Sequence, residues 1–227
     1  MKKIIALAMV AVAAVSMATA EITVGARGML GWSLGSSLPE EAKAFGFKFD
    51  AGKSFDFGFA AFVNIPLVAD LGIQPELGFS HNSVGMKYTM DLGPFGSFTG
   101  KTWFSYNAID IPVLVTYGIK LNDSLTITPL LGPKFSIPVG KIKGTAEVDG
   151  EKSESDPVKI GSPLLFGIVF GADVAFKLGP GAIVGDIRYD LGLTKLKTKS
   201  EFAGRTEKAD LVTPRALTLS VGYQLAF

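Results

Sequence analysis

The sequence predicts an all-β fold, an eight-stranded antiparallel up-and-down transmembrane β-barrel, and three observations favour it. First, large apolar residues alternate with small or polar residues at a period of two along most of the chain. Second, although 48% of the residues are hydrophobic, no uncharged apolar run of about 18 residues follows residue 20 to form a transmembrane helix. Third, the connections between the alternating segments are short and long in turn.

Residues 1–20 have the features of a cleaved secretory signal peptide of the bacterial kind. Two lysines precede an apolar stretch that is shorter than the roughly 20 residues a spanning helix needs. Ala18 and Ala20 form a small-x-small cleavage site, so we expect cleavage before Glu21 and a barrel domain over residues 21–227. The alternative is a retained anchor helix, which the short apolar run disfavours.

The alternation divides the exported chain into eight strands. In chain order, we expect them at residues 22–34, 54–65, 71–88, 102–120, 124–140, 164–177, 183–193 and 212–227. Their apolar faces begin at Ile22, Phe55, Ile73, Ile109, Leu125, Leu164, Ile183 and Leu217 and continue at every second residue. These faces lack Asp, Glu, Lys and Arg, as a lipid-facing surface requires, because Arg or Lys at the bilayer midplane costs about 2–4 kcal/mol.

The alternative architecture, a soluble β-sandwich, fits the other face and the connections less well. The second face of the strands is rich in Gly, Ala, Ser and Thr, which suits the interior of a narrow barrel better than a solvated surface. Short connections fall at residues 66–70, 122–123 and 179–181, and long ones at residues 35–53, 90–101, 141–159 and 196–211. Outer-membrane barrels have short periplasmic turns and long extracellular loops, and an eight-stranded barrel needs this number of each.

Composition excludes some classes of partner. Without the two lysines of the signal peptide, 20 basic residues face 21 acidic ones, a net charge of −1. We expect no nucleic-acid partner, because such a partner calls for a basic stripe. The chain has no Cys, although an exported protein can form disulfides, so its stability must come from another source such as a closed hydrogen-bonded barrel.

Eight charged residues fall on the inward faces by parity. They are Arg27, Glu76, Asp110, Lys134, Asp173, Asp186, Arg188 and Asp190, with a summed charge of −2. Isolated charges in a narrow lumen are costly, so we expect them to pair and to form a charge network. This network is either a structural plug that closes the bore, a gate or narrow ion path whose pairs exchange partners, or a proton-transfer site.

Three segments, taken in order, resemble a known family. They are I-P-V-L-V at residues 111–115, L-L-G-P-K-F at 130–135 and D-I-R-Y-D-L-G-L at 186–193. The sequence is similar to the outer-membrane β-barrel domain family, with small porin-like and PorT-like proteins and the eight-stranded barrel of outer membrane protein A. The resemblance runs from the fourth strand onward and implies this fold and a place in the cell outer membrane. It implies no activity, because members of the family have diverse roles.

The end of the chain is similar to a sorting signal of this class of protein. Ser220, Gly222, Leu225 and Phe227 follow the pattern of a polar residue, Gly, hydrophobic residues and a terminal aromatic by which the barrel-assembly machinery recognises its substrates. The alternative is an ordinary amphipathic last strand.

No arrangement in the sequence indicates catalysis, a cofactor or a metal. His81 is the only histidine, and parity places it on the outward face while the nearby Ser80 faces inward, which does not suit a Ser-His-Asp site. With one His and no Cys a transition-metal site is not expected, and no EF-hand spacing is present. We expect a protein that is not an enzyme and has no cofactor.

The long connections leave two questions open. Residues 195–208 carry five bases and two acids, which suits contact with lipopolysaccharide, lipid headgroups or host glycans, or a merely solvated loop. Residues 141–159 are polar and of mixed charge, so we expect a mobile loop there. In the first long connection, Ser37 predicts a helix start, whereas Phe45, Phe47 and Phe49 predict an outward extension of the second strand.

These observations lead to one expected function and one alternative. We expect a monomeric integral outer-membrane protein in contact with the lipid bilayer and lipopolysaccharide, with a structural or surface-interaction role in envelope integrity or adhesion. The alternative is a narrow porin or channel that passes small solutes or hydrophobic molecules.

Overall fold

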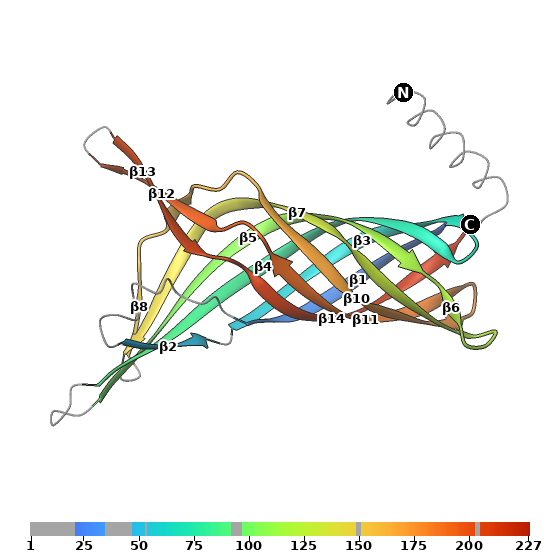
Figure 1. The fold of residues 1–227 in the computed structure, drawn as a ribbon, viewed down its shortest axis with the longest axis horizontal. Helices are drawn as coiled ribbons and strands as arrows, with labels where there is room; N and C mark the ends of the chain where they lie inside the picture. The colour runs from blue at the N-terminus through green and yellow to red at the C-terminus, as the bar shows by residue number, and fades with distance from the viewer. Residues whose placement is uncertain (1–20, 35–46, 53, 92–96, 149–150, 203–204) are drawn as a thin grey trace.

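Eight antiparallel strands close into a barrel in the computed structural model, which describes residues 21–34, 47–52, 54–91, 97–148, 151–202 and 205–227. These strands are β1 (Thr23–Ser33), β3 (Ser54–Val68), β4 (Leu71–Asp91), β5 (Ser97–Tyr117), β7 (Leu125–Val148), β10 (Leu165–Leu178), β11 (Gly181–Gly192) and β14 (Arg215–Ala226). Each pairs with two neighbours, and the pairings of β1 with β14 and of β10 with β7 complete the ring (Figure 1). The expected fold class is confirmed, whereas the expected signal peptide lies outside the described residues.

Six shorter strands extend this barrel. They are β2 (Phe47–Gly52), β6 (Ile119–Lys120), β8 (Glu151–Glu154), β9 (Val158–Ile160), β12 (Leu196–Phe202) and β13 (Arg205–Val212). Apart from β6, they lie at the end of the barrel opposite the C-terminus, which we call the loop end (Figure 1). No helix within the described ranges is long and apolar enough to cross a membrane.

The short turns and the C-terminus share the other end, which we call the turn end (Figure 1). The turn between β3 and β4 contains Ala69 with a φ of 50°, and the turn between β10 and β11 contains Gly179 with a φ of 63°. Such left-handed conformations allow the chain to reverse over very few residues. The ring closes at this end, where the Phe227 N–H donates to the Ile22 carbonyl at 2.8 Å and the Ile22 N–H donates back at 3.2 Å.

The two faces of the barrel wall have the expected assignment. Apolar side chains point outward and stay exposed, as in Phe59 and Val221, both 64% exposed. Polar and charged side chains such as Ser80, Asp110 and Asp173 point inward and are buried. The outer surface is therefore an apolar band of the kind that contacts lipid, and the period-two pattern of the sequence is its cause.

The expected end of the fifth strand and the expected loop after it were wrong. Strand β7 continues to Val148, which pairs with Gly100 of β5, and the chain then turns back into β8. Gly140 has a φ of 80° at a bulge that adds residues opposite Tyr106. Within this bulge Ile142 is 1% exposed, so burial of its side chain holds the chain in the sheet where the charged composition suggests a mobile loop.

The other long connections also form strands where the structure describes them. Strands β12 and β13 pair as an antiparallel hairpin over most of residues 195–208. Strand β2 pairs with β4 from Phe47 opposite Met90 to Gly52 opposite Gly85, just beyond the β3–β4 pairing. For residues 47–52 the prediction of a strand extension is therefore confirmed. The predicted helix start at Ser37, and Phe45, lie outside the described residues.

Candidate functional site

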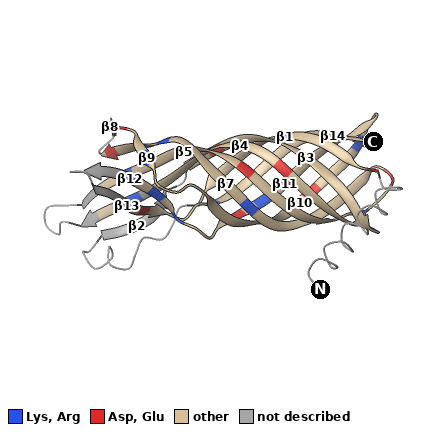
Figure 2. Ribbon diagram, turned by 90° about the horizontal axis from the view of Figure 1, so that it is seen from above, with Lys and Arg blue, Asp and Glu red and all other residues tan. Residues whose placement is uncertain are grey.

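Charged residues gather along the middle of the barrel, where six strands contribute them (Figure 2), and most of their side chains are buried. The structure brings together all eight residues that the sequence places on inward faces. Two groups result, one around a pair of arginines and one around a lysine. We call the two groups together the ionic network, with members Arg27, Glu76, Asp110, Lys134, Asp173, Asp186, Arg188 and Asp190.

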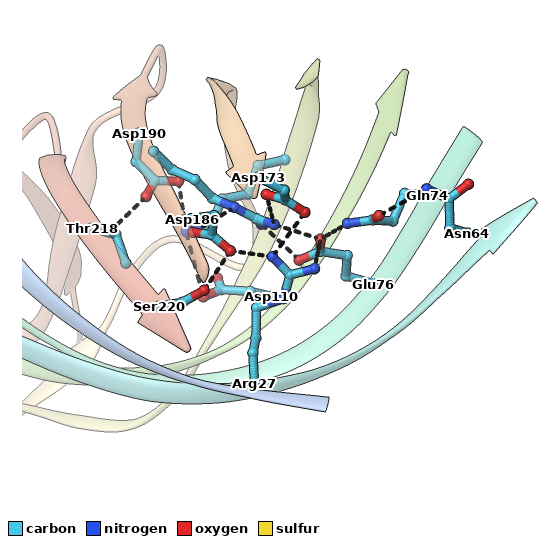
Figure 3. Close-up of polar contacts among 12 residues, drawn as sticks. Arg27, Asn64, Gln74, Glu76, Asp110, Asp173, Asp186, Asp190, Thr218 and Ser220 are labelled. Atoms are coloured by element: carbon cyan, nitrogen blue, oxygen red, sulfur yellow. Dashed lines mark hydrogen bonds and ion pairs between the residues drawn. The ribbon is translucent and has the colours of Figure 1, made fainter. Parts of the chain in front are cut away.

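In the arginine group, two guanidinium groups meet three carboxylates (Figure 3). Arg188 binds Glu76 with two parallel contacts, Nη1 to Oε2 at 2.9 Å and Nη2 to Oε1 at 3.0 Å. Its Nε lies 3.1 Å from Asp186 Oδ1, and its Nη2 lies 3.5 Å from Asp173 Oδ1. Bidentate pairing fixes both partners in orientation as well as position, because the planar guanidinium matches the carboxylate.

Arg27 of β1, which only β14 separates from β11, contacts the same three carboxylates. Its Nη1 pairs with Asp186 and lies 3.5 Å from Asp173 Oδ2, and its Nη2 lies 3.5 Å from Glu76 Oε1. The five side chains of the group are between 0% and 9% exposed. Because β1, β4, β10 and β11 all contribute, the group spans the bore from wall to wall.

The lysine group lies beside it. Lys134 Nζ is 3.1 Å from Asp190 Oδ1 and 3.5 Å from Asp110 Oδ2. The Ser136 hydroxyl donates to Asp110 at 2.5 Å, and the Thr218 hydroxyl donates to Asp190 at 3.3 Å. The side chains of Lys134 and Asp190 are 21% and 22% exposed, so this group borders an open space within the barrel.

Polar neighbours extend the ionic network beyond the expected set. Gln74 donates to Glu76 Oε1 at 2.7 Å, and Asn64 donates to Gln74 at 3.3 Å, toward the turn end (Figure 3). Asp56, also buried, accepts the Ser83 N–H at 2.5 Å. Asp56 was missed as an inward charge, although its place between two outward phenylalanines indicates the inward face. Uncharged neighbours cannot be found from parity alone, because it does not show which inward residues meet.

A buried aromatic ring closes the space beneath Arg27. The guanidinium carbon of Arg27 lies 4.0 Å from the centre of the Phe62 ring, in the range of a cation–π contact. The ring has room because Gly25 lacks a side chain, and a Cβ at that position would overlap the ring. Strand β1 thus contributes the Arg27 charge, and its Gly25 leaves the space that the Phe62 ring fills.

On the loop side of the ionic network lies a cavity of about 110 Å³. Glu76, Lys134 and Arg188 line it on one side, and Val84, Tyr106 and Leu165 on the other. The last three belong to a buried apolar cluster, which we call the lid cluster, with members Val84, Tyr106, Ala108, Ile142, Leu165 and Leu196. The interior therefore contains a small chamber between a charged layer and an apolar layer.

His81 lies apart from the ionic network. Its ring stacks on Phe57 with centroids 5.0 Å apart, and its Nδ1 lies 2.8 Å from Asn107 Oδ1. No hydroxyl nucleophile takes part in these contacts. Among the described residues, no group of three acidic, histidine or cysteine side chains is arranged to hold a metal ion.

Three residues of the C-terminal motif lie in β14, on both of its faces, and the fourth, Phe227, follows its last residue. Leu225 and Phe227 point outward and are exposed, whereas the Ser220 hydroxyl donates to Asp186 inside the barrel. A Cβ at Gly222 would overlap the Ala26 carbonyl oxygen and lie 2.8 Å from Arg27 Cα, so Gly222 allows β14 to approach β1 closely. Half of the motif thus also supports the ionic network.

Comparison with known proteins gives one family and several distant structures. The family model described as outer membrane protein beta-barrel domain matches residues 20–198. Among curated protein sequences, none is significantly similar to this chain.

The chain is also similar, at low sequence identity, to solved outer-membrane proteins. The outer membrane protein OprG from Pseudomonas aeruginosa is 13% identical, with a TM-score of 0.49 and coverage of 91% of this chain and 96% of that one. A major outer membrane protein from Thermus thermophilus is 15% identical, with a TM-score of 0.49 and coverage of 91% and 99%. Neisserial surface protein A is 16% identical, with a TM-score of 0.41 and coverage of 91% and 97%.

Proposed function

Because the chain belongs to the outer membrane protein beta-barrel domain family and is an integral protein of the cell outer membrane, we propose that it works as a closed barrel. In this proposal its role is structural or one of surface interaction, in envelope integrity or adhesion. The loop end faces the exterior, as in barrels that have short periplasmic turns. The protein then acts through its outer surface rather than by passing solutes through its lumen.

One observation supports the closed lumen above all others: the arginine group crosses the bore. Arg27 and Arg188 each contact Glu76, Asp173 and Asp186, and every side chain in the group is nearly inaccessible. An ion that passed this layer would have to break several ion pairs in a narrow, low-dielectric space. Phe62 fills the space beneath Arg27. The alternative of a narrow channel requires an opening past all of these side chains.

Planar-bilayer recording tests the closed lumen. We expect the purified protein to insert without a steady unitary conductance in roughly 1 M KCl, where even a small pore is detectable, because the arginine group blocks the path at every moment. The variants R27A and R188A, each of which removes one of the two guanidinium groups from the layer, serve as positive controls and should conduct. Steady conductance of the unaltered protein, with ion selectivity changed in R188A, would establish the channel instead.

The remaining parts of the proposal concern assembly and partners. We propose that the barrel is monomeric, since its eight strands have no open edge to offer a second copy, and that the barrel-assembly machinery inserts it through Ser220, Gly222, Leu225 and Phe227. We propose no enzymatic role. His81 bonds to Asn107 and stacks on Phe57, an environment that anchors a side chain at the outer surface of the barrel.

A further inference from the structure

Four lysines follow one another across the strands at the loop end, and we call them the lysine row. Lys141 of β7 pairs with Lys159 of β9. Lys159 pairs in turn with Lys199 of β12, and the next position in register, on β13, is Lys208. Residues directly opposite each other share one face of a sheet, with neighbouring strands about 4.8 Å apart. Four positive residues thus occupy consecutive positions on a single line.

The opposite face of this small sheet is packed onto the barrel. Ile142, next to Lys141, belongs to the lid cluster and is 1% exposed, and Ile160, next to Lys159, packs against that cluster. Lys141 and Lys159 are exposed. Because burial fixes one face, the lysine row is held in place on the other face rather than carried on a loose loop. A rigid array loses little conformational freedom when it binds a partner.

The charge around the lysine row is unbalanced. Lys195 and Lys197, in the same hairpin, both pair with Asp210, at 3.0 and 3.2 Å. The Asp210 carboxylate therefore pairs with two ammonium groups, neither of which belongs to the lysine row. Lys159 and Lys199 also have contacts within the chain. Like charges directly opposite each other destabilise a sheet, and a bound anion relieves this repulsion.

The lysine row also rises away from the lipid surface. Lys141 follows exposed Ile137 of β7 by four residues, and Lys199 follows exposed Leu193 by six. Its near end therefore lies at the edge of the apolar band and its far end further out. Strands of such barrels tilt by about 35–45°, so a line across them climbs obliquely from the membrane.

From this placement we infer that the lysine row binds the headgroup of a phosphorylated glycolipid of the outer leaflet. A phospholipid carries one phosphate at one depth, whereas a phosphorylated sugar headgroup presents several anionic groups along the membrane normal. The oblique climb of the row matches the second arrangement. The inference rests on the proposed surface role, for which it names a partner, and does not depend on whether the lumen is closed.

A pair of matched triple variants tests this inference. K141Q/K159Q/K199Q removes three charges from the lysine row. K87Q/K101Q/K152Q removes three charges from another cross-strand line at the loop end, in which Glu147 stands between Lys101 and Lys152 and pairs with Lys101 at 3.1 Å. The charge change is the same in both, so only the position differs. Retention of the heat-dependent shift in gel migration identifies the folded forms.

The measurement is the affinity of each protein, in neutral detergent micelles, for a fluorescent bisphosphorylated glycolipid. Each lysine near a lipid surface contributes about a fivefold factor, so the row variant should bind about a hundredfold more weakly. The control variant should change less than about fivefold, the factor for one lysine. Equal losses in the two variants, or no loss in the row variant, would overturn the inference.

Two further arms separate the sources of phosphate. The same phosphorylated sugar without acyl chains, and inorganic pyrophosphate, should bind far more weakly than the glycolipid. If either binds as tightly, the partner is a soluble polyanion and the lipid assignment is wrong. Conductance measured on the same preparation reports only on the lumen, so a failure of the closed-barrel proposal is distinguishable from a failure of this one.

Discussion

Arg27 shows how one side chain organises the inside of this barrel. It faces three carboxylates on one side and the Phe62 ring on the other. Removing one partner of a buried ion pair is costly, because the charges left behind remain desolvated. Replacing exposed partners costs little, because water and salt screen them.

We predict that removing the charge of Arg27 lowers the free energy of unfolding much more than removing the charge of Lys101. R27M should lower the free energy of unfolding by about 3–5 kcal/mol, since Glu76, Asp173 and Asp186 would keep only Arg188. K101M, which removes an exposed pair with Glu147, should lower it by at most about 1 kcal/mol. Urea titrations in lipid vesicles, followed by tryptophan fluorescence, give both values. Equal values would show that the ionic network does not stabilise the fold; if R27M does not fold, R27K serves in its place.

The sequence predicts the inward charges because a strand places alternate residues on opposite faces. Parity, however, assigns a face and not a neighbour. That Arg188 binds Glu76 across the bore depends on the tilt and stagger of strands that are 112 residues apart in the chain. The contact between Arg27 and Phe62 also depends on the tilt and stagger of the strands. The sequence does not show that Gly25 leaves space for the Phe62 ring, because it does not show that the two residues are neighbours.

At the scale of elements, the β12–β13 hairpin depends on ion pairs at its base. Hydrogen bonds from Lys195 and Lys197 hold the pKa of Asp210 below its usual range. A carboxyl whose pKa is lower in the folded state than in the unfolded state stabilises the fold above the unfolded pKa. That contribution is lost as the pH falls through the folded pKa.

We therefore predict that acid loosens the base of this hairpin. Carbon-13 NMR of the Asp210 carboxyl should show a midpoint below that of an ordinary aspartate, and the protection of amides at the base of the hairpin, relative to their intrinsic exchange at each pH, should decrease as the pH falls through it. In K195M/K197M the midpoint should return to the ordinary range, since both hydrogen bonds are gone. An unchanged midpoint in that variant contradicts the assigned cause. The D210N protein should show no acid-dependent loss of amide protection at this site.

Element boundaries follow the sequence closely within the apolar band and poorly beyond it. Within the apolar band, one face of each strand contacts lipid, so apolar residues alternate strictly with small or polar ones. Beyond it, strand β7 continues to Val148 because Ile142 is buried and β5 supplies hydrogen bonds, neither of which the local composition shows. Charged composition alone therefore underestimates strand length at the loop end.

For the whole molecule, closure of the ring depends on its two ends. Phe227 and Ile22 exchange backbone hydrogen bonds, and the Phe227 side chain is 75% exposed. A side chain so exposed makes few contacts within the protein, so its stabilising effect inside the barrel is small. The assembly role proposed for it is consequently separable from a packing role.

Deletion of Phe227 should reduce insertion much more than it reduces the stability of barrels already formed. The measurements are the rate of folding by purified assembly machinery and the midpoint of unfolding in urea. F176A is the control, because Phe176 is another outward phenylalanine near the turn end and is 51% exposed. It should fold at the normal rate. Parallel losses of rate and stability on deletion of Phe227 would make it an ordinary packing residue.

At Gly140, strand β7 changes the neighbour on one of its two edges. On both sides of Gly140, β7 pairs with β5. On its other edge it pairs with β10 below Gly140 and with β9 and β8 above it. Substitutions in the upper part therefore leave the lower hydrogen-bond register intact. Under immune or phage pressure, the outer half of such a protein can diversify while the embedded half stays constant, so lineages should differ most above this one glycine.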